Sequence, residues 1–176
     1  TDGTVERTAG TVTTSSGVDP NGANNTSTID AIPVMTSSTT PSGVASASSY
    51  NGQYVAFWAF DGFDTDANHI WITASGSTGW LQYQFPTAKI INKYSITVHN
   101  IVRAPHTFSL QGSNTGAFAG EQVTISAGTH SAAWVAGVKE YFIFSNSTAY
   151  THYRLDVTVN KGDVLLSVGV LELIEA

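Results

Sequence analysis

Apolar and polar residues alternate with a period of two along most of the chain after residue 31. Leu81, Tyr83 and Phe85 are separated by glutamines, and residues 94–98 and 153–159 repeat the pattern. Successive side chains of a strand point to opposite faces, so this spacing predicts strands with one face in a core. No stretch shows the spacing of a convincing amphipathic helix.

Two segments depart from simple alternation. Residues 141–144 are apolar throughout, which is typical of a strand that is buried on both faces. In the last segment Leu166, Val168 and Val170 share one phase, whereas Leu171 and Leu173 share the other. A bulge near Val170 would explain this switch.

Turn signals separate these strands: Gly76–Gly79, Gly112–Asn114, Gly128, Gly137 and Lys161–Asp163. Many short strands with regular turns predict an all-β, antiparallel β-sandwich. Residues 1–30 are rich in Thr, Ser, Gly and Asn, so we expect a linker or an N-terminal arm there, with a short strand that pairs with a neighbour. The folded domain is predicted to span residues 31–176.

Composition narrows the function. The 176 residues include no cysteine, which excludes disulfides and thiolate metal sites. Only 11% of the residues are charged, the net charge is −6, and the seven Lys and Arg are scattered. A basic patch for nucleic acid or for an anionic membrane is therefore not expected. No apolar run reaches the length of about 18 residues that a membrane span needs, so we expect no membrane insertion.

Several short segments carry a recognisable order: residues 45–49, 59–62, Trp71, 80–83, 103–105, 108–113, 153–155 and 171–173. In this order they resemble the discoidin or coagulation-factor-5/8 type C family, which overlaps the family 32 carbohydrate-binding modules. The resemblance implies a jelly-roll sandwich of about eight strands, of the galactose-binding-like type. It also implies that ligands bind in loops at one end of the sandwich.

The resemblance further indicates a sugar site. In sugar-binding members, residues at places resembling His69 and Arg103 contact the ligand, and an aromatic residue resembling Tyr150 stacks on the sugar ring. Asn68, His106 and Asn146 are further candidates, since planar polar side chains on loops bind pairs of hydroxyls. The carbohydrate hypothesis predicts that His69, Arg103 and Tyr150 lie together around one binding site.

Each candidate has a structural alternative. A loop arginine is often solvated or paired with a carboxylate, and Asn146 is equally suited to hold its own turn. Trp71 and Trp80 are expected in the core, because large aromatic residues usually fill sandwiches. His99, His130 and His152 have no supporting neighbours in the sequence, so we interpret them as structural or solvated.

A calcium site is the second hypothesis. Asp61, Asp64 and Asp66 lie within six residues, and calcium prefers oxygen ligands in a tight loop. The resemblance implies a structural calcium closed by a late glutamate, here Glu172, which would stiffen the loop. Alternatively, Asp61 caps a turn.

Signature motifs of common enzymes are missing from the sequence, so we predict a protein that is not an enzyme. The leading hypothesis is a non-catalytic module that attaches a larger oligomer or multidomain assembly to cell-surface glycans, of the galactose type, at an extracellular or virion surface. The assembly would be a phage tail or fibre, or a bacterial surface enzyme. One alternative is a structural decoration or docking domain of a virion with protein contacts only. Another, less favoured, is phospholipid binding through exposed apolar loop residues.

Overall fold

The computed structural model describes residues 6–8, 11–13 and 27–176, and within them the chain is almost entirely strand and loop. The strands are β1 (Glu6–Thr8), β2 (Thr11–Thr13), β3 (Val44–Ala47), β4 (Trp71–Ile72), β5 (Gly79–Lys89), β6 (Ile91–Thr97), β7 (Pro105–Ser113), β8 (Val123–Thr129), β9 (Lys139–Ile143), β10 (Tyr150–Asn160), β11 (Ser167–Val168) and β12 (Val170–Glu175). One 3-10 helix, η1 (Ala56–Phe60), precedes β4.

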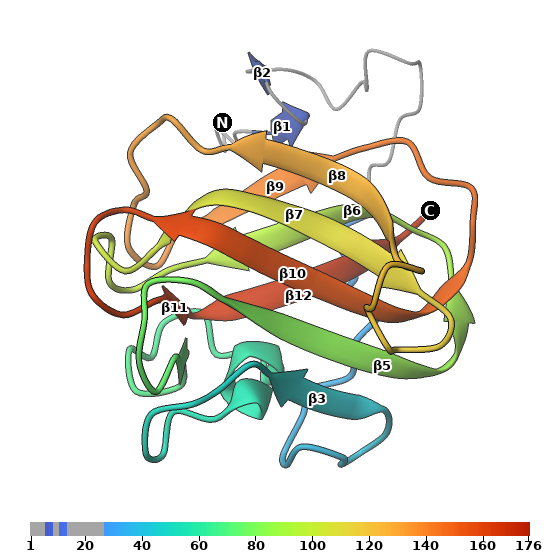
Figure 1. Cartoon of the computed structure of the whole chain (residues 1–176), viewed down its shortest axis with the longest axis horizontal. Helices are drawn as coiled ribbons and strands as arrows, with labels where there is room; N and C mark the ends of the chain where they lie inside the picture. Colours follow the sequence, from blue (N-terminus) through green and yellow to red (C-terminus); the bar gives the residue numbers. More distant parts are fainter. Residues whose placement is uncertain (1–5, 9–10, 14–26) are drawn as a thin grey trace.

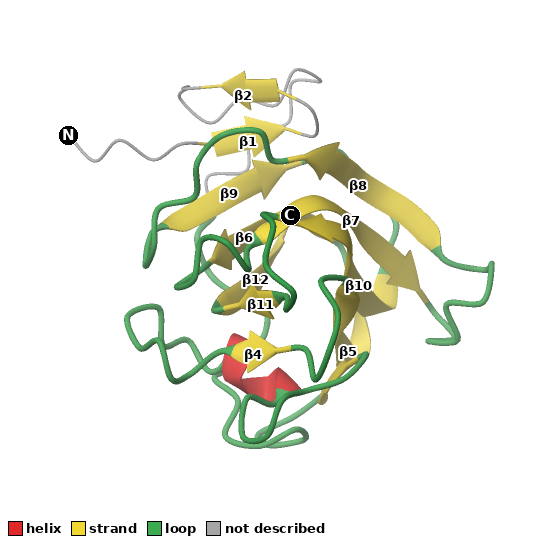
Figure 2. Ribbon diagram, turned by 60° about the vertical axis from the view of Figure 1, so that its left-hand side comes forward, coloured by secondary structure: helices red, strands yellow, loops and turns green. Residues whose placement is uncertain are grey.

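Two five-stranded sheets face each other. Figure 1 shows the sheet β3-β5-β10-β7-β8 in front of the sheet β12-β6-β9-β1-β2. A small sheet of β4 and β11 closes one end, as Figure 2 shows. All strand pairs are antiparallel except β1 with β9. The predicted all-β, jelly-roll sandwich is therefore confirmed.

The front sheet follows the alternation read from the sequence. Leu81, Tyr83 and Phe85 of β5 point into the core, as do Tyr153 and Leu155 of β10. Burial of each such side chain contributes about 1.5–3 kcal/mol to folding. The polar residues that alternate with these core residues lie on the outer face of the sheet.

The back sheet is buried on both faces. In β6, Tyr94 and Ile96 are buried, but so are Ser95 and Thr97, which alternate with them. One cover is the segment before β3: Lys93 of β6 is buried on this face and donates from Nζ to the carbonyl of Ser27 at 3.1 Å. Polar residues on this face consequently need partners within the protein.

Two sequence expectations change in detail. The phase switch near Val170 is a break at Gly169, which ends β11 and begins β12 in a different sheet. Trp71 is fully buried as expected, but Trp80 lies half-buried on the outer face of the front sheet. The expectation that Trp80 belongs to the core was wrong.

The N-terminal segment contributes strands to the domain. β1 pairs with β9 of the same chain, and β2 pairs with β1 at the edge of the back sheet. Within the described residues no helix has the length and apolar character needed to cross a membrane.

Candidate functional site

Four loops meet at the end of the sandwich that lies on the left in Figure 1 and comes forward in Figure 2. They are residues 61–70, 98–104, 130–138 and 161–166. Backbone hydrogen bonds join three of them: the N–H of Gly137 donates to the carbonyl of Val98 at 2.8 Å, and that of Asp163 to the carbonyl of Val102 at 3.1 Å. The loop 61–70 is attached through Asp64, whose Oδ1 accepts from Oγ1 of Thr97 at 3.2 Å. The side chains on these loops are therefore held by a fixed frame.

His69 is held by a buried carboxylate and two aromatic rings. Its Nδ1 lies 2.6 Å from Oδ2 of Asp61, and its ring lies 4.1 Å from that of Trp58 and 4.8 Å from that of Phe63. Burial raises the pKa of Asp61, while the N–H of Phe63 and the imidazole oppose the rise. Because Nδ1 is engaged, Nε2 is the ring atom left for another partner, 3.9 Å from Asp66 Oδ2.

Asn68 is used within its own loop. Its backbone N–H and its side-chain amide both donate to Oδ1 of Asp66, at 2.8 and 3.1 Å. The backbone bond lowers the pKa of Asp66. The structure thus gives Asn68 a turn-holding contact beside His69.

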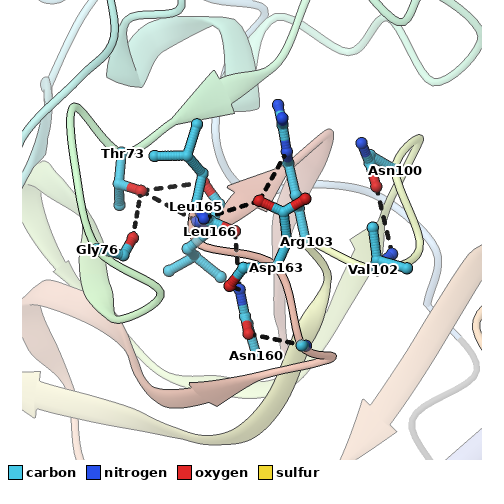
Figure 3. A network of polar contacts seen from close by, with 10 residues as sticks. Thr73, Gly76, Asn100, Val102, Arg103, Asn160, Asp163, Leu165 and Leu166 are labelled. Atoms are coloured by element: carbon cyan, nitrogen blue, oxygen red, sulfur yellow. Dashed lines mark hydrogen bonds and ion pairs between the residues drawn. The ribbon is translucent and has the colours of Figure 1, made fainter.

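Arg103 carries unused hydrogen-bonding capacity. Its Nε lies 3.4 Å from Oδ1 of Asp163, an ion-pair distance, yet Nε is buried without a hydrogen bond among the described residues. Figure 3 shows the guanidinium extending past Asp163. The bond from the Leu165 N–H to Asp163 lowers the pKa of that carboxyl, and Arg103 adds to the effect. Asp163 thus orients the arginine, while the rest of the guanidinium donates no hydrogen bond to a described residue.

Two more buried nitrogens without a hydrogen-bond partner in the described part of the chain lie at the same end, His99 Nε2 and His130 Nδ1. The ring of His99 packs over Gly169, where a Cβ would come within 2.9 Å of it. Only the fold brings His99 beside Gly169, so the sequence could not predict this packing.

His106 lies at the beginning of β7, half-buried. Its Nδ1 is 3.3 Å from Oγ1 of Thr107, and its carbonyl accepts the N–H of His130. It belongs to the same end as Arg103, but the structure records no contact between the two side chains.

Tyr150 and Asn146 lie at the opposite end. Tyr150 begins β10, whereas the loop that contacts Arg103 follows the end of β10, so an eleven-residue strand of roughly 33 Å separates them. Tyr150 is only 8% exposed, and its ring fills the space above Gly112. The prediction that Tyr150 joins His69 and Arg103 in one cradle was wrong.

Asn146 holds its own turn, the alternative that the sequence left open. Its Nδ2 donates to the carbonyls of Ile91 and Thr148, and its Oδ1 accepts the N–H of Thr148. Asn146 also borders a shallow surface hollow of about 250 Å³ with Asn92 and Phe144. This hollow lies away from Arg103.

The four predicted calcium ligands do not form one ligand set. Asp61 binds His69, and Asp66 binds Asn68, whereas Asp64 and Glu172 lie on either side of the Lys139 ammonium, at 3.2 and 2.5 Å. Burial by itself would lower the pKa of Lys139, but Glu172 and Asp64 outweigh it and raise the pKa. No group of three His, Asp or Glu side chains in the described ranges is arranged to hold a metal.

No protein-family model and no curated protein matches the sequence. Solved structures do match the fold. A family 32 module of Clostridium perfringens in complex with GalNAc-β-1,3-galactose is 22% identical with a TM-score of 0.61, covering 75% of this chain and 94% of that one. Chitosan-binding module 1 of a Paenibacillus chitosanase/glucanase is 19% identical, with a TM-score of 0.61 and coverages of 75% and 94%.

A third match is the family 32 module of NanJ from C. perfringens in complex with galactose, 18% identical with a TM-score of 0.60, covering 74% of this chain and 92% of that one. The chain therefore shares the galactose-binding-like fold of family 32 carbohydrate-binding modules. The predicted resemblance is confirmed at the level of the fold.

Proposed function

We propose that the protein is a non-catalytic carbohydrate-binding module whose ligand lies on the loops around His69 and Arg103. The observation that carries the proposal is the guanidinium of Arg103, which Asp163 orients through Nε at the same end as His69 and whose two Nη groups donate to no described residue. A charged donor that is already positioned loses little freedom when it binds a pair of sugar hydroxyls. The carbohydrate ligands of several solved structures with this fold support the choice of ligand class.

The aromatic residues beside His69 supply the second element of sugar recognition. Trp58 and Phe63 flank the imidazole, and Phe63 is 52% exposed. An exposed ring packs against the apolar C–H face of a sugar, while the neighbouring imidazole binds a hydroxyl. Tyr150 has no part in this site.

A single open site of this kind binds weakly, so we propose that the module acts in several copies within a larger assembly at an extracellular or virion surface. Several sites that engage one glycan-coated surface together raise the overall affinity by about 10²–10⁴. The attachment of a phage tail or of a bacterial surface enzyme to cell-surface glycans fits this role.

Isothermal titration with galactose and N-acetylgalactosamine, followed by a glycan array, tests the proposal. Arg103→Ala removes charged hydrogen bonds and is expected to lower the affinity about tenfold to a hundredfold. Arg103→Lys retains the charge but loses the planar fork, so we expect it to restore only part of the affinity. If the protein binds no glycan, or if Arg103→Ala binds as the wild type does, the proposal fails.

A docking domain with protein contacts only is the second candidate. It is favoured by β2, the outermost strand of the back sheet, since an edge strand offers backbone groups to a neighbouring chain. A protein that ignores the glycan array, yet forms oligomers that Val12→Pro disrupts, would support this candidate instead.

A further inference from the structure

Trp80 differs from the other three tryptophans in the use of its indole N–H. Trp58, Trp71 and Trp134 each donate this hydrogen to a backbone carbonyl at 2.8 Å. Trp80 makes no such bond among the described residues, and its side chain lies half-buried on the outer face of the front sheet. A large ring with a free donor at a protein surface is suited to a ligand that is apolar on one side and polar on the other.

Polar side chains surround Trp80 in strand register. Asp156 of β10 lies directly opposite Trp80, and Ser109 of β7 lies opposite Asp156. One row further along, Gln82, Arg154 and Gln111 are aligned in the same order. Since neighbouring strands lie about 4.8 Å apart, the six side chains form a patch roughly 10 Å wide, about the width of one or two sugar rings.

The hydrogen-bonding groups of this patch are partly fixed and partly free. Arg154 donates from Nε and Nη2 to Oε1 of Gln82, at 3.1 and 2.9 Å, and its guanidinium stacks on the ring of Trp80 at 4.1 Å. The carboxylate of Asp156 accepts no hydrogen bond from any described residue. The patch therefore offers a rigid ring, one free donor and one free acceptor.

The loop between β7 and β8, which lies at the right in Figure 1, contributes Phe118 to the patch. Phe118 places its ring 3.7 Å from the Arg154 guanidinium, on a backbone with φ of 47°. A bulky residue in this left-handed region costs about 1–3 kcal/mol, and such strain is found mostly where the fold holds a side chain for use. The carboxylate of Glu121 accepts the N–H of Phe118 and so keeps the loop in place.

We propose that the outer face of the front sheet, at Trp80, Asp156, Ser109 and Gln111, is a second binding surface for an uncharged oligosaccharide. The ring of Trp80 packs on the C–H face of a sugar, its N–H donates to a hydroxyl, and Asp156 accepts from another. The ligand is uncharged because Arg154 and Asp156 balance each other and Arg154 is already engaged. This surface is separate from the loops around Arg103.

The indole signals of the four tryptophans in a ¹⁵N–¹H NMR spectrum report on this surface directly. The Trp80 signal is assigned by its loss in Trp80→Phe. The probes are hexasaccharides of β-1,4-linked N-acetylglucosamine and of β-1,4-linked galactose, with oligogalacturonate as the charged comparison. We expect the Trp80 signal to move with at least one neutral probe, in the wild type and in Arg103→Ala alike, and not with the charged probe.

Variants measure the contribution of the patch in the Arg103→Ala background, where the loop site is weakened. Trp80→Ala should lower the remaining affinity about three- to tenfold, and the isosteric Asp156→Asn should lower it as well. Tyr50→Ala, which removes an exposed ring outside the patch, should have no effect.

Two results overturn the inference. In the first, the Trp80 signal does not move with either neutral probe. In the second, Arg103→Ala by itself abolishes all binding of the neutral probes. If the Trp80 signal moves but the residues of the loops around Arg103 do not respond to any probe, the proposed function is contradicted and this inference stands.

Discussion

The two ends of the sandwich carry similar polar residues but use them differently. At one end, Arg103 and His99 have buried nitrogens without a hydrogen-bond partner among the described residues. At the other end, the amide of Asn146 donates to two carbonyls and accepts one N–H, and Tyr150 is packed over Gly112. The comparison teaches that a loop residue is a binding candidate when the fold orients it and leaves part of its hydrogen-bonding capacity unused.

Asp30, outside both groups of loops, gives the largest expected effect on stability. Burial raises the pKa of Asp30 to about 7, against the bonds from the Ile32 and Leu173 N–H groups. The folded protein then binds more protons than the unfolded chain between about pH 4 and 7, so the free energy of unfolding falls as the pH rises through this window. At about 1.4 kcal/mol per pKa unit, the fall amounts to at most about 4 kcal/mol.

Urea unfolding at several pH values checks this effect. Asp30→Asn keeps an oxygen for the two N–H groups and cannot ionise, so its stability should change less between pH 4 and 7 than that of the wild type. Glycan affinity per folded molecule should be the same in both proteins. Identical pH profiles of unfolding would show that Asp30 titrates normally.

Lys139 provides the next largest effect. In Lys139→Met the carboxylates of half-buried Asp64 and buried Glu172 lose their shared ammonium, and we expect the protein to lose about 2–3 kcal/mol of stability. Lys89→Met is the matched control: it removes an ion pair with Glu175 at the surface and should cost at most about 1 kcal/mol. Equal losses in the two variants would contradict the role of Lys139 as an internal cation.

Calcium sharpens this test. Because the ammonium already lies between Asp64 and Glu172, we expect millimolar calcium to leave the Tm of the wild type unchanged. A rise in Tm that requires Asp64 would instead support the calcium site predicted from the sequence.

The two candidate asparagines should differ by a smaller amount. Asn146→Ala leaves the carbonyls of Ile91 and Thr148 without their donor and should cost about 1–2 kcal/mol without changing glycan affinity. Asn68→Ala removes a contact within an exposed loop and should cost about 0.5 kcal/mol or less, but it loosens the loop that carries His69. The contrast would be broken if Asn146→Ala weakened glycan binding more than Asn68→Ala.

Much of the fold was predictable because alternation is a local property. The phase that buries Leu81 also places Trp80 on the opposite face, and the pattern was therefore a better guide than the usual burial of tryptophan. The bulge expected near Val170 proved to be a break at Gly169, one residue away.

The site was only partly predictable because strand pairing is not local. Arg103 comes just before β7 and Tyr150 begins β10, and these strands are antiparallel neighbours. The beginnings of two antiparallel neighbours lie at opposite ends of a sheet, so the two residues cannot meet. The periodicity of each strand does not indicate that β7 and β10 are partners. It likewise does not indicate that Lys139 contacts Asp64.

Mapping of backbone amide shifts during titration with galactose or N-acetylgalactosamine tests the central claim most directly. The account predicts that the largest shifts fall in residues 61–70, 98–104 and 161–166, that they vanish in Arg103→Ala, and that they persist in Tyr150→Phe. Shifts that cluster at residues 144–150, or that survive Arg103→Ala unchanged, would contradict it.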